Sequence, residues 1–183
     1  MVDGVAGAGA AAGVVAVGAA EVFPAGVAAP EAAARAAVGN PMSTNSLTID
    51  HEQLVAASHA AERLTSGEIR VALARHKIGD PMAAARKHFV RLKMARTAER
   101  NGVLILVAPR SRNFAIFGDT GVHEKCGDAF WQEVASAMTE FFRRGDFTGG
   151  IIHGVERAGA LLAGHFPRRS DDRNELPDDI EEV

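Results

Sequence analysis

Four oxygen-bearing residues in the middle of the chain stand where apolar segments begin or end. They are Ser66, Glu68, Asn101 and Asp119. Carboxylate and neutral oxygens are the ligands that Ca²⁺ and Mg²⁺ prefer, and a bound cation can in turn hold a phosphate. We therefore expect a divalent-cation site, with Asp119 as the best candidate for a catalytic residue. The alternative is that these side chains cap helices and turns, or face water at the start of a strand.

Other catalytic and metal motifs are incomplete. The Asp-Thr-Gly triplet at Asp119 is typical of aspartic proteases, but those enzymes need two such carboxylates and this chain has one triplet. A phosphatase loop built on Cys126 would need arginine at the position of Gln132. His123 and Cys126 have no second pair to complete a zinc site. Any phosphatase activity would therefore be weak and metal-assisted.

A second group of residues is basic and offers a different function. Its members are Arg75, Lys77, Arg110, Arg112, Arg143 and Arg144. Such a group can attract an acidic protein helix or a lipid-facing partner, and the alternative is a solvated face. Nucleic acid is a poorer candidate, because the net charge is −3 and no aromatic residues alternate with the arginines.

The elements that position both groups follow from hydrophobic periodicity and from helix caps. Asp50, Asp80 and Asp146 are predicted N-caps. Trp131 and Phe130 are predicted to pack between helix and sheet. The predicted helices span residues 50–64, 81–100, 123–144 and 147–166. The predicted strands span residues 68–74, 102–108 and 113–118.

The order of these elements predicts the fold. A strand, a helix and a second strand form a right-handed parallel unit, so strands 68–74 and 102–108 are parallel. Strand 113–118 follows a short turn and is antiparallel to its neighbour. We expect a three-layer α/β/α sandwich with a small mixed sheet, in a single domain. The four oxygen-bearing residues then gather at one edge of the sheet, where strands 68–74 and 102–108 begin. The six basic residues form a basic rim at the opposite edge, where these strands end.

The two ends of the chain differ from the predicted domain at residues 46–166. Residues 1–45 are rich in alanine and glycine, and we expect a disordered extension, of which residues 1–41 are absent if the protein starts at Met42. A secretory signal is the alternative, although no lysine or arginine precedes the apolar run. Residues 167–183 hold seven acidic residues against three arginines, which predicts a disordered acidic tail.

Composition limits the class of protein further. The chain has 183 residues, of which 47% are hydrophobic and 23% charged, which is typical of a globular protein and unlike a collagen or a coiled coil. A single cysteine cannot form an internal disulfide, which is compatible with a cytoplasmic location and, less directly, with export. No apolar run is long enough to predict a membrane span.

Four segments resemble the TPM domain family in their order and spacing. Residues 65–71 are similar to the opening strand motif of the family, and residues 101–107 to its central strand motif. Residues 118–125 resemble the segment after the third strand in short bacterial members, and residues 144–147 resemble the Gly-Asp-Tyr/Phe turn between the last two helices. The resemblance covers about residues 50–166.

The resemblance implies an α/β/α fold and a loosely defined function. Family members are described as weak acid phosphatases, as calcium-binding proteins, or as accessory proteins of membrane and photosystem complexes. For this chain it therefore implies a bound Ca²⁺ or Mg²⁺ and a membrane-associated helical protein as partner. Many bacterial relatives carry a C-terminal membrane anchor that this sequence lacks, which favours a soluble form.

Overall fold

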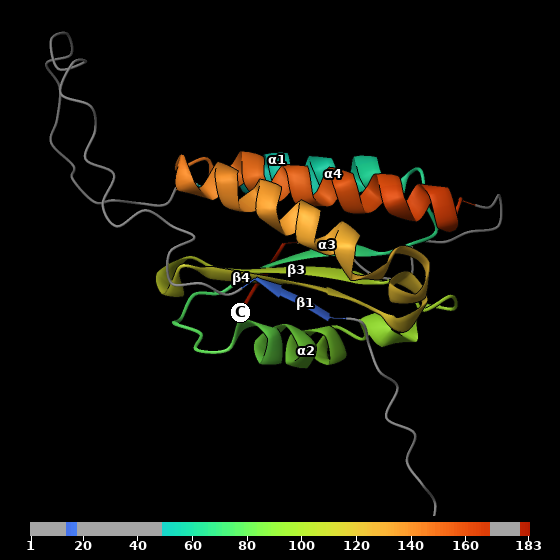
Figure 1. Ribbon diagram of the computed structural model, residues 1–183, viewed down its shortest axis with the longest axis horizontal. Helices are drawn as coiled ribbons and strands as arrows, with labels where there is room; N and C mark the ends of the chain where they lie inside the picture. Colours follow the sequence, from blue (N-terminus) through green and yellow to red (C-terminus); the bar gives the residue numbers. More distant parts are fainter. Residues whose placement is uncertain (1–13, 18–48, 169–179) are drawn as a thin grey trace, which may run out of the picture.

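The protein is known from a computed structural model, which describes residues 14–17, 49–168 and 180–183 (Figure 1). The strands are β1 (Val14–Val17), β2 (Ile69–Leu73), β3 (Val103–Ala108), β4 (Asn113–Gly118) and β5 (Glu181–Glu182). The helices are α1 (His51–Glu62), α2 (Pro81–Arg91), α3 (Thr120–Arg143) and α4 (Phe147–His165), with short 3-10 turns η1 (Met94–Arg96) and η2 (Pro109–Ser111).

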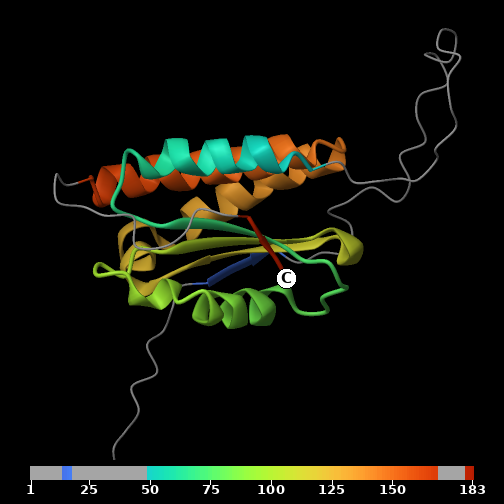
Figure 2. The same ribbon diagram turned by 180° about the vertical axis from the view of Figure 1, so that it is seen from behind.

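These elements form three layers. The sheet lies in the middle, with the strand order β1-β4-β3-β2-β5. Helices α1, α3 and α4 cover one face and α2 covers the other, as both views show (Figures 1 and 2). The predicted α/β/α fold with a small mixed sheet is confirmed. In the part of the chain that the structure describes, no helix is both long enough and apolar enough to cross a membrane.

The three central strands have the predicted directions. β2 and β3 are parallel, with Ile69 opposite Val103, and β3 and β4 are antiparallel, with Val103 opposite Gly118. Every residue of these strands is buried, because helices cover both faces of the sheet. The register places the end of β4 beside the starts of β2 and β3, which is the edge where the oxygen-bearing residues were predicted.

Two edge strands were not predicted. Val14–Val17 pairs antiparallel with β4, and Glu181–Glu182 pairs parallel with β2. Both segments lie in parts of the chain expected to be disordered, residues 1–45 and 167–183. Most residues of these two parts are outside the described residues. Neither segment carries a long alternating pattern, so each depends on the backbone groups that an edge of the sheet offers.

The helix predicted over residues 81–100 is shorter in the structure. α2 ends at Arg91, Lys93 takes a left-handed conformation (φ 61°), and η1 follows. Met94 is fully buried in the same core cluster as Phe89. In a continuous helix Met94 would point about 140° away from Phe89, so the helix must end for both side chains to enter the core. The prediction was wrong here, and the freed residues 97–101 form part of the site described below.

The other helices agree with their predicted caps and packing. The Asp50 carboxylate accepts from the Gln53 N–H, and Asp80 and Asp146 cap α2 and α4 in the same way. Trp131 of α3 is buried in the core between this helix and the sheet, as expected. Helix α3 breaks at Gly127, whose φ of 63° suits glycine.

Candidate functional site

Asp119 ends β4 and is the N-cap of α3. Its side chain is only 1% exposed. Its backbone N–H donates to the carbonyl of Gly102, the residue before β3, at 2.9 Å. Carboxylate Oδ1 accepts from the Thr120 N–H at 2.7 Å. A carboxylate at this position satisfies a free donor of the helix and interacts favourably with the helix dipole. The structural alternative for Asp119, a cap, is confirmed.

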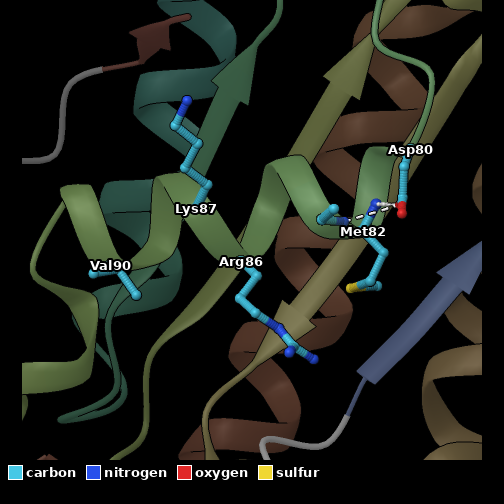
Figure 3. A pocket seen from close by; sticks show the side chains of 6 residues that line it. Asp80, Met82, Arg86, Lys87 and Val90 are labelled. Atoms are coloured by element: carbon cyan, nitrogen blue, oxygen red, sulfur yellow. Dashed lines mark hydrogen bonds between the residues drawn. The ribbon is translucent and has the colours of Figure 1, made fainter.

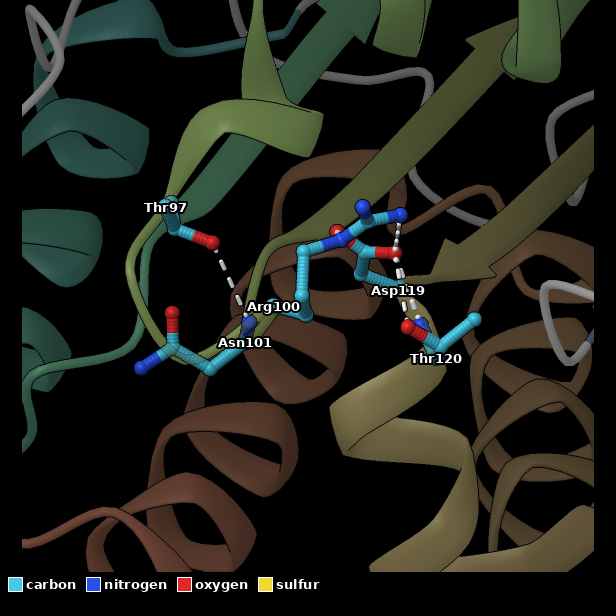
Figure 4. Close-up of polar contacts among 5 residues, drawn as sticks. All are labelled: Thr97, Arg100, Asn101, Asp119 and Thr120. Atoms are coloured by element: carbon cyan, nitrogen blue, oxygen red, sulfur yellow. Dashed lines mark hydrogen bonds and ion pairs between the residues drawn. The ribbon is translucent and has the colours of Figure 1, made fainter. Parts of the chain in front are cut away.

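Arg100 holds the rest of the Asp119 carboxylate. Its Nε donates to Oδ2 at 2.7 Å and its Nη2 to Oδ1 at 2.8 Å, a bidentate ion pair (Figure 4). The guanidinium is about half exposed, whereas the carboxylate is buried. The hydrogen bond to Asp119 raises the pKa of Arg100 above its ordinary value. Both Asp119 oxygens are therefore already engaged by groups of the chain itself.

Two unusual backbone features allow this pair to form. Arg100 has a left-handed conformation, with φ of 53°. Gly121, in the first turn of α3, lies directly beneath the loop that carries Arg100: a Cβ at this position would be 2.4 Å from the Glu99 carbonyl oxygen and 2.8 Å from that of Arg100. Only glycine lets the loop and the helix start approach so closely.

Ser66, Glu99 and Asn101 form a second polar cluster at the same edge. The Ser66 hydroxyl donates to Glu99 Oε2 at 2.8 Å, and Asn101 Nδ2 donates to Ser66 Oγ at 3.3 Å. Asn101 is 2% exposed, and its Oδ1 atom is buried without a hydrogen-bond partner among the described residues. The Thr97 hydroxyl accepts from the Asn101 N–H and fixes the loop (Figure 4).

The four predicted cation ligands thus lie at one edge but in separate environments. Ser66 and Asn101 are in contact, Asp119 is bound to Arg100, and Glu68 is buried at the start of β2. Over residues 49–168 and the short described strands, no group of three or more histidine, cysteine or acidic residues could hold a metal ion. Cation binding by these four residues stays a prediction.

Cys126 offers no activated nucleophile. Its thiol donates to the Val122 carbonyl at 2.7 Å within α3. Burial raises the pKa of the Cys126 thiol above its ordinary value, which keeps the thiol protonated near neutral pH. His123 lies nearby but faces Asp128, with 3.6 Å between His123 Nδ1 and the carboxylate.

The six residues of the predicted basic rim lie at the opposite end of the sheet. Arg75 and Lys77 follow β2, and Arg110 and Arg112 lie in the β3–β4 turn. The two loops are tied together, because the Ile78 N–H donates to Ser111 Oγ and Asn113 Nδ2 donates to the Ile78 carbonyl at 3.1 Å. The end of α3, which carries Arg143 and Arg144, lies on the same side of the molecule in both views (Figures 1 and 2).

The rim cations differ in how they are paired. Arg75 forms an ion pair with Glu182 of β5, and Arg143 with Glu140 one turn before it. Arg144 lies over the Phe141 ring, with 4.7 Å between its guanidinium carbon and the ring centre. Lys77 and Arg110 are exposed, and Arg112 is half-buried. These last three form no ion pair with any residue in the described segments.

A shallow groove of about 570 Å³ lies on the outer surface of α2 (Figure 3). Met82 and the exposed Val90 supply its apolar part, and Asp80, Arg86 and Lys87 are its charged residues. The groove runs along α2 from Asp80, three residues after Lys77 of the rim, to Val90.

Three residues that make important contacts were not predicted from the sequence: Glu99, Arg100 and Arg70. Arg100 and Glu99 were placed inside a helix, so their contacts with Asp119 and Ser66 could not be foreseen. Arg70 was assigned to a strand without a role, although its charge within a buried strand was an available signal. A cation in a fully covered strand requires a partner.

Comparisons with known proteins give one family. The family model of the TPM domain matches residues 43–161. The solution structure of the BA42 protein from the psychrophilic bacterium Bizionia argentinensis is similar over 78% of this chain and 100% of its own length, with 39% sequence identity and a TM-score of 0.69. The N-terminal domain of the cg2496 protein from Corynebacterium glutamicum is 16% identical over 72% of this chain and 84% of its own, with a TM-score of 0.47. A comparison with curated proteins finds no significant match.

Proposed function

Because the chain belongs to the TPM domain family, we propose that it is an accessory domain that docks an acidic protein partner through its basic rim. The observation that carries this proposal is the contrast in pairing along the rim. Lys77, Arg110 and Arg112 have no ion pair with a described residue, on loops that hydrogen bonds hold in place. Preorganised cations of one sign attract and orient an acidic partner.

The chemistry of the rim favours a protein over other partners. Arg75, the rim residue next to β2, already holds a glutamate of this chain, so a carboxylate fits this end of the sheet. A membrane-associated helical protein with acidic residues, the partner implied by the resemblance, would satisfy the remaining cations. The rim has no aromatic residues on which nucleic acid bases could stack, apart from Phe141 beneath Arg144.

Charge reversal tests the rim. The full chain carrying both Arg110→Glu and Arg112→Glu is titrated with a fluorescent ten-residue polyglutamate peptide at low and at physiological ionic strength. We expect at least a ten-fold loss of affinity at low salt, and a smaller loss at the higher ionic strength because salt screens the interaction. Equal affinity of wild type and variant would overturn the proposal.

The control reverses charge elsewhere. Arg86→Glu with Lys87→Glu changes the net charge by the same amount in the groove on α2, outside the rim. We expect this variant to stay within about two-fold of the wild type at physiological ionic strength, where charges more than a Debye length apart are screened. Vesicles of anionic lipid are tested separately. If the wild type bound the vesicles but not the peptide, and the Arg110→Glu, Arg112→Glu variant lost this binding, the partner would be a membrane surface and not a protein.

Cation binding is the second candidate, because one observation favours it. Asn101 Oδ1 is buried without a hydrogen-bond partner among the described residues, beside the Ser66 hydroxyl and the Glu99 carboxylate. One anionic and two neutral oxygens suit Ca²⁺ or Mg²⁺. Asp119 fits this role less well than the sequence predicted, since Arg100 already neutralises it. Weak phosphohydrolase activity would depend on such a cation to hold the phosphate.

A calcium and magnesium titration followed by amide NMR tests the second candidate. We expect shifts at Ser66, Glu99 and Asn101 that disappear in Glu99→Gln and persist in Glu156→Gln, an exposed glutamate of α4. Asp119→Asn is the third variant: retained shifts would show that Asp119 is not a ligand. Unchanged spectra at millimolar metal would reject the cation site and, with it, metal-assisted phosphatase activity.

A further inference from the structure

The outer edge of β2 already binds an extended acidic strand. β5 lies parallel to β2, with Glu181 opposite Ala72 and Glu182 opposite Leu73. The Val183 N–H donates to the Leu73 carbonyl at 3.0 Å, and the Arg75 N–H donates to the Val183 carbonyl at 2.7 Å. Figure 2 shows this short strand, in dark red, in front of the sheet. The edge therefore accepts a strand by backbone hydrogen bonds.

The bound strand covers only part of that edge. β2 has five residues, and β5 pairs with the last two. At the other end the Ile69 N–H donates to the Glu62 side chain at 3.0 Å, so a carboxylate takes the place of a strand there. No strand in the described segments pairs with Arg70 or Val71 on this side. A longer strand could extend the ladder toward Val71.

Arg70 gives the edge its preference for acidic residues. Its side chain is 3% exposed, and its Nε atom is buried without a hydrogen-bond partner among the described residues. Its Nη1 atom lies 3.9 Å from Glu181 Oε1, and Arg91 Nη2 lies 3.8 Å from Glu181 Oε2. Charge-assisted hydrogen bonds between such groups are about 2.7–2.9 Å long. Glu181 therefore neutralises a buried cation without filling its hydrogen-bonding capacity.

The flanking side chains add a pattern to this preference. Ile180 packs against the core beneath α1 and α4, and Val183 against the core beneath α2. Glu182 pairs with Arg75. The strand that fits this edge thus reads apolar, acidic, acidic, apolar, with its first acidic side chain directed at Arg70 and Arg91.

We propose that the β2 edge is the binding site for an extended acidic segment of the partner protein, and that Ile180, Glu181, Glu182 and Val183 act as an internal competitor for it. This inference rests on the docking function proposed above. It names the segment of the partner that would bind the β2 edge once the rim has attracted the partner. The two-residue pairing and the long distances to Glu181 show that the internal strand leaves part of the bonding capacity of this edge unused. A partner strand that pairs along more of β2 and bonds Arg70 Nε would displace it.

Peptide competition in the full chain tests the proposal. The chain is made as wild type and with Glu181→Gln and Glu182→Gln together, which keeps side-chain size but removes the charge of the competitor. A fluorescent peptide of residues 176–183 is titrated into each. We expect the double variant to bind this peptide at least ten-fold more tightly than the wild type, with amide shifts concentrated at Val71, Leu73 and Arg75.

Three peptides and one variant define the specificity. A peptide of different sequence but the same pattern, Val-Asp-Asp-Leu in place of the last four residues, should bind with similar affinity. A peptide with both glutamates changed to glutamine should bind at least ten-fold more weakly, and so should a scrambled one. Adding Arg91→Gln, a change at a half-exposed residue, to the double variant should weaken the acidic peptides and leave the glutamine peptide unaffected.

Three results would overturn the proposal. Equal peptide affinity of wild type and double variant would show that the internal strand does not compete. Binding that is indifferent to the glutamates would remove the role of Arg70 and Arg91. A wild-type dimer that becomes monomeric in the double variant would make a second copy the occupant in place of a partner protein. None of these results touches Arg110 or Arg112, so the rim proposal stands or fails by its own charge-reversal test.

Discussion

The two ends of the sheet carry charged residues in opposite ways. Where β4 ends, the Asp119 carboxylate is buried and bound by Arg100 and by the start of α3. At the basic rim, Lys77 and Arg110 are exposed, and Arg75 is paired with a glutamate of a two-residue strand. Removing one partner of a buried, hydrogen-bonded charge destabilises a fold, because the other polar groups lose their partner. Exposed charges contribute little to stability and more to association. We therefore expect substitutions at the first end to change stability most, and the second end is the one that we propose for binding.

Asp119→Ala should cause the largest loss of stability. The change removes an N-cap and a bidentate ion pair, and we expect the free energy of unfolding to fall by about 2–3 kcal/mol, with a discount for the half-exposed guanidinium of Arg100. Urea denaturation followed by circular dichroism measures the change. The matched control is Asp80→Ala, which removes an exposed cap of α2 and should cost about 1 kcal/mol. Equal losses would mean that Arg100 contributes nothing.

Gly121→Ala should have the second-largest effect. The added Cβ would overlap the Glu99 carbonyl, so the loop of residues 97–101 must move, and we expect a cost of about 2 kcal/mol. Gly164→Ala in α4 is the control: outside the backbone of α4 itself, no described atom lies within 4 Å of the place its methyl group would take, and alanine there should stabilise the helix by up to about 1 kcal/mol. If Gly121→Ala stabilised the protein as Gly164→Ala is expected to, glycine would not be needed at position 121 for the close packing of loop and helix.

Glu182→Ala should leave stability nearly unchanged. Its ion pair with Arg75 is solvent-exposed, with 67% of the arginine side chain accessible, so we expect a loss below about 1 kcal/mol in the same urea experiment. The amide signals of Arg75 and Leu73 should nevertheless shift, because β5 bonds to their backbone groups. A loss as large as that of Asp119→Ala would remove the contrast between the two ends.

The smallest effect concerns His88 of α2, which interacts electrostatically with Glu181 of the same acidic strand. Burial lowers the pKa of His88, the charges of Arg91 and Lys87 lower it further, and Glu181 opposes them. Glu181→Gln should therefore lower the pKa of His88 again, while Glu182→Gln, directed at Arg75, should not. NMR titration of the histidine ring measures both variants. An unchanged pKa in Glu181→Gln would mean that β5 does not occupy this place in solution.

The sign of the related stability change follows from linkage. A histidine whose pKa is lower in the folded state binds fewer protons there than in the unfolded chain. His88 therefore costs no stability above the ordinary histidine pKa, and stability falls as the pH drops through that value toward the lowered one. Glu181→Gln should make this acid-side loss larger, because Glu181 is the group that raises the His88 pKa.

Much of the fold followed from local patterns. The all-apolar run Val103–Ala108 indicated a covered central strand, and Asp50, Asp80 and Asp146 marked helix starts through hydrogen bonds within one turn. These interactions join residues close in sequence, so the sequence alone determined them. The gathering of Ser66, Asn101 and Asp119 at one edge also followed, because strand direction determines it.

The tertiary structure decided what those residues do. Local periodicity continues the helix through Arg100, and only the burial of Met94 beside Phe89 ends it early and brings Arg100 onto Asp119. In the same way, nothing local marks Glu181 and Glu182 as a strand; the open edge of β2 and the buried charge of Arg70 give them their place. Contacts between residues far apart in the chain depend on the whole packed core, and a pattern read within a few residues does not contain them.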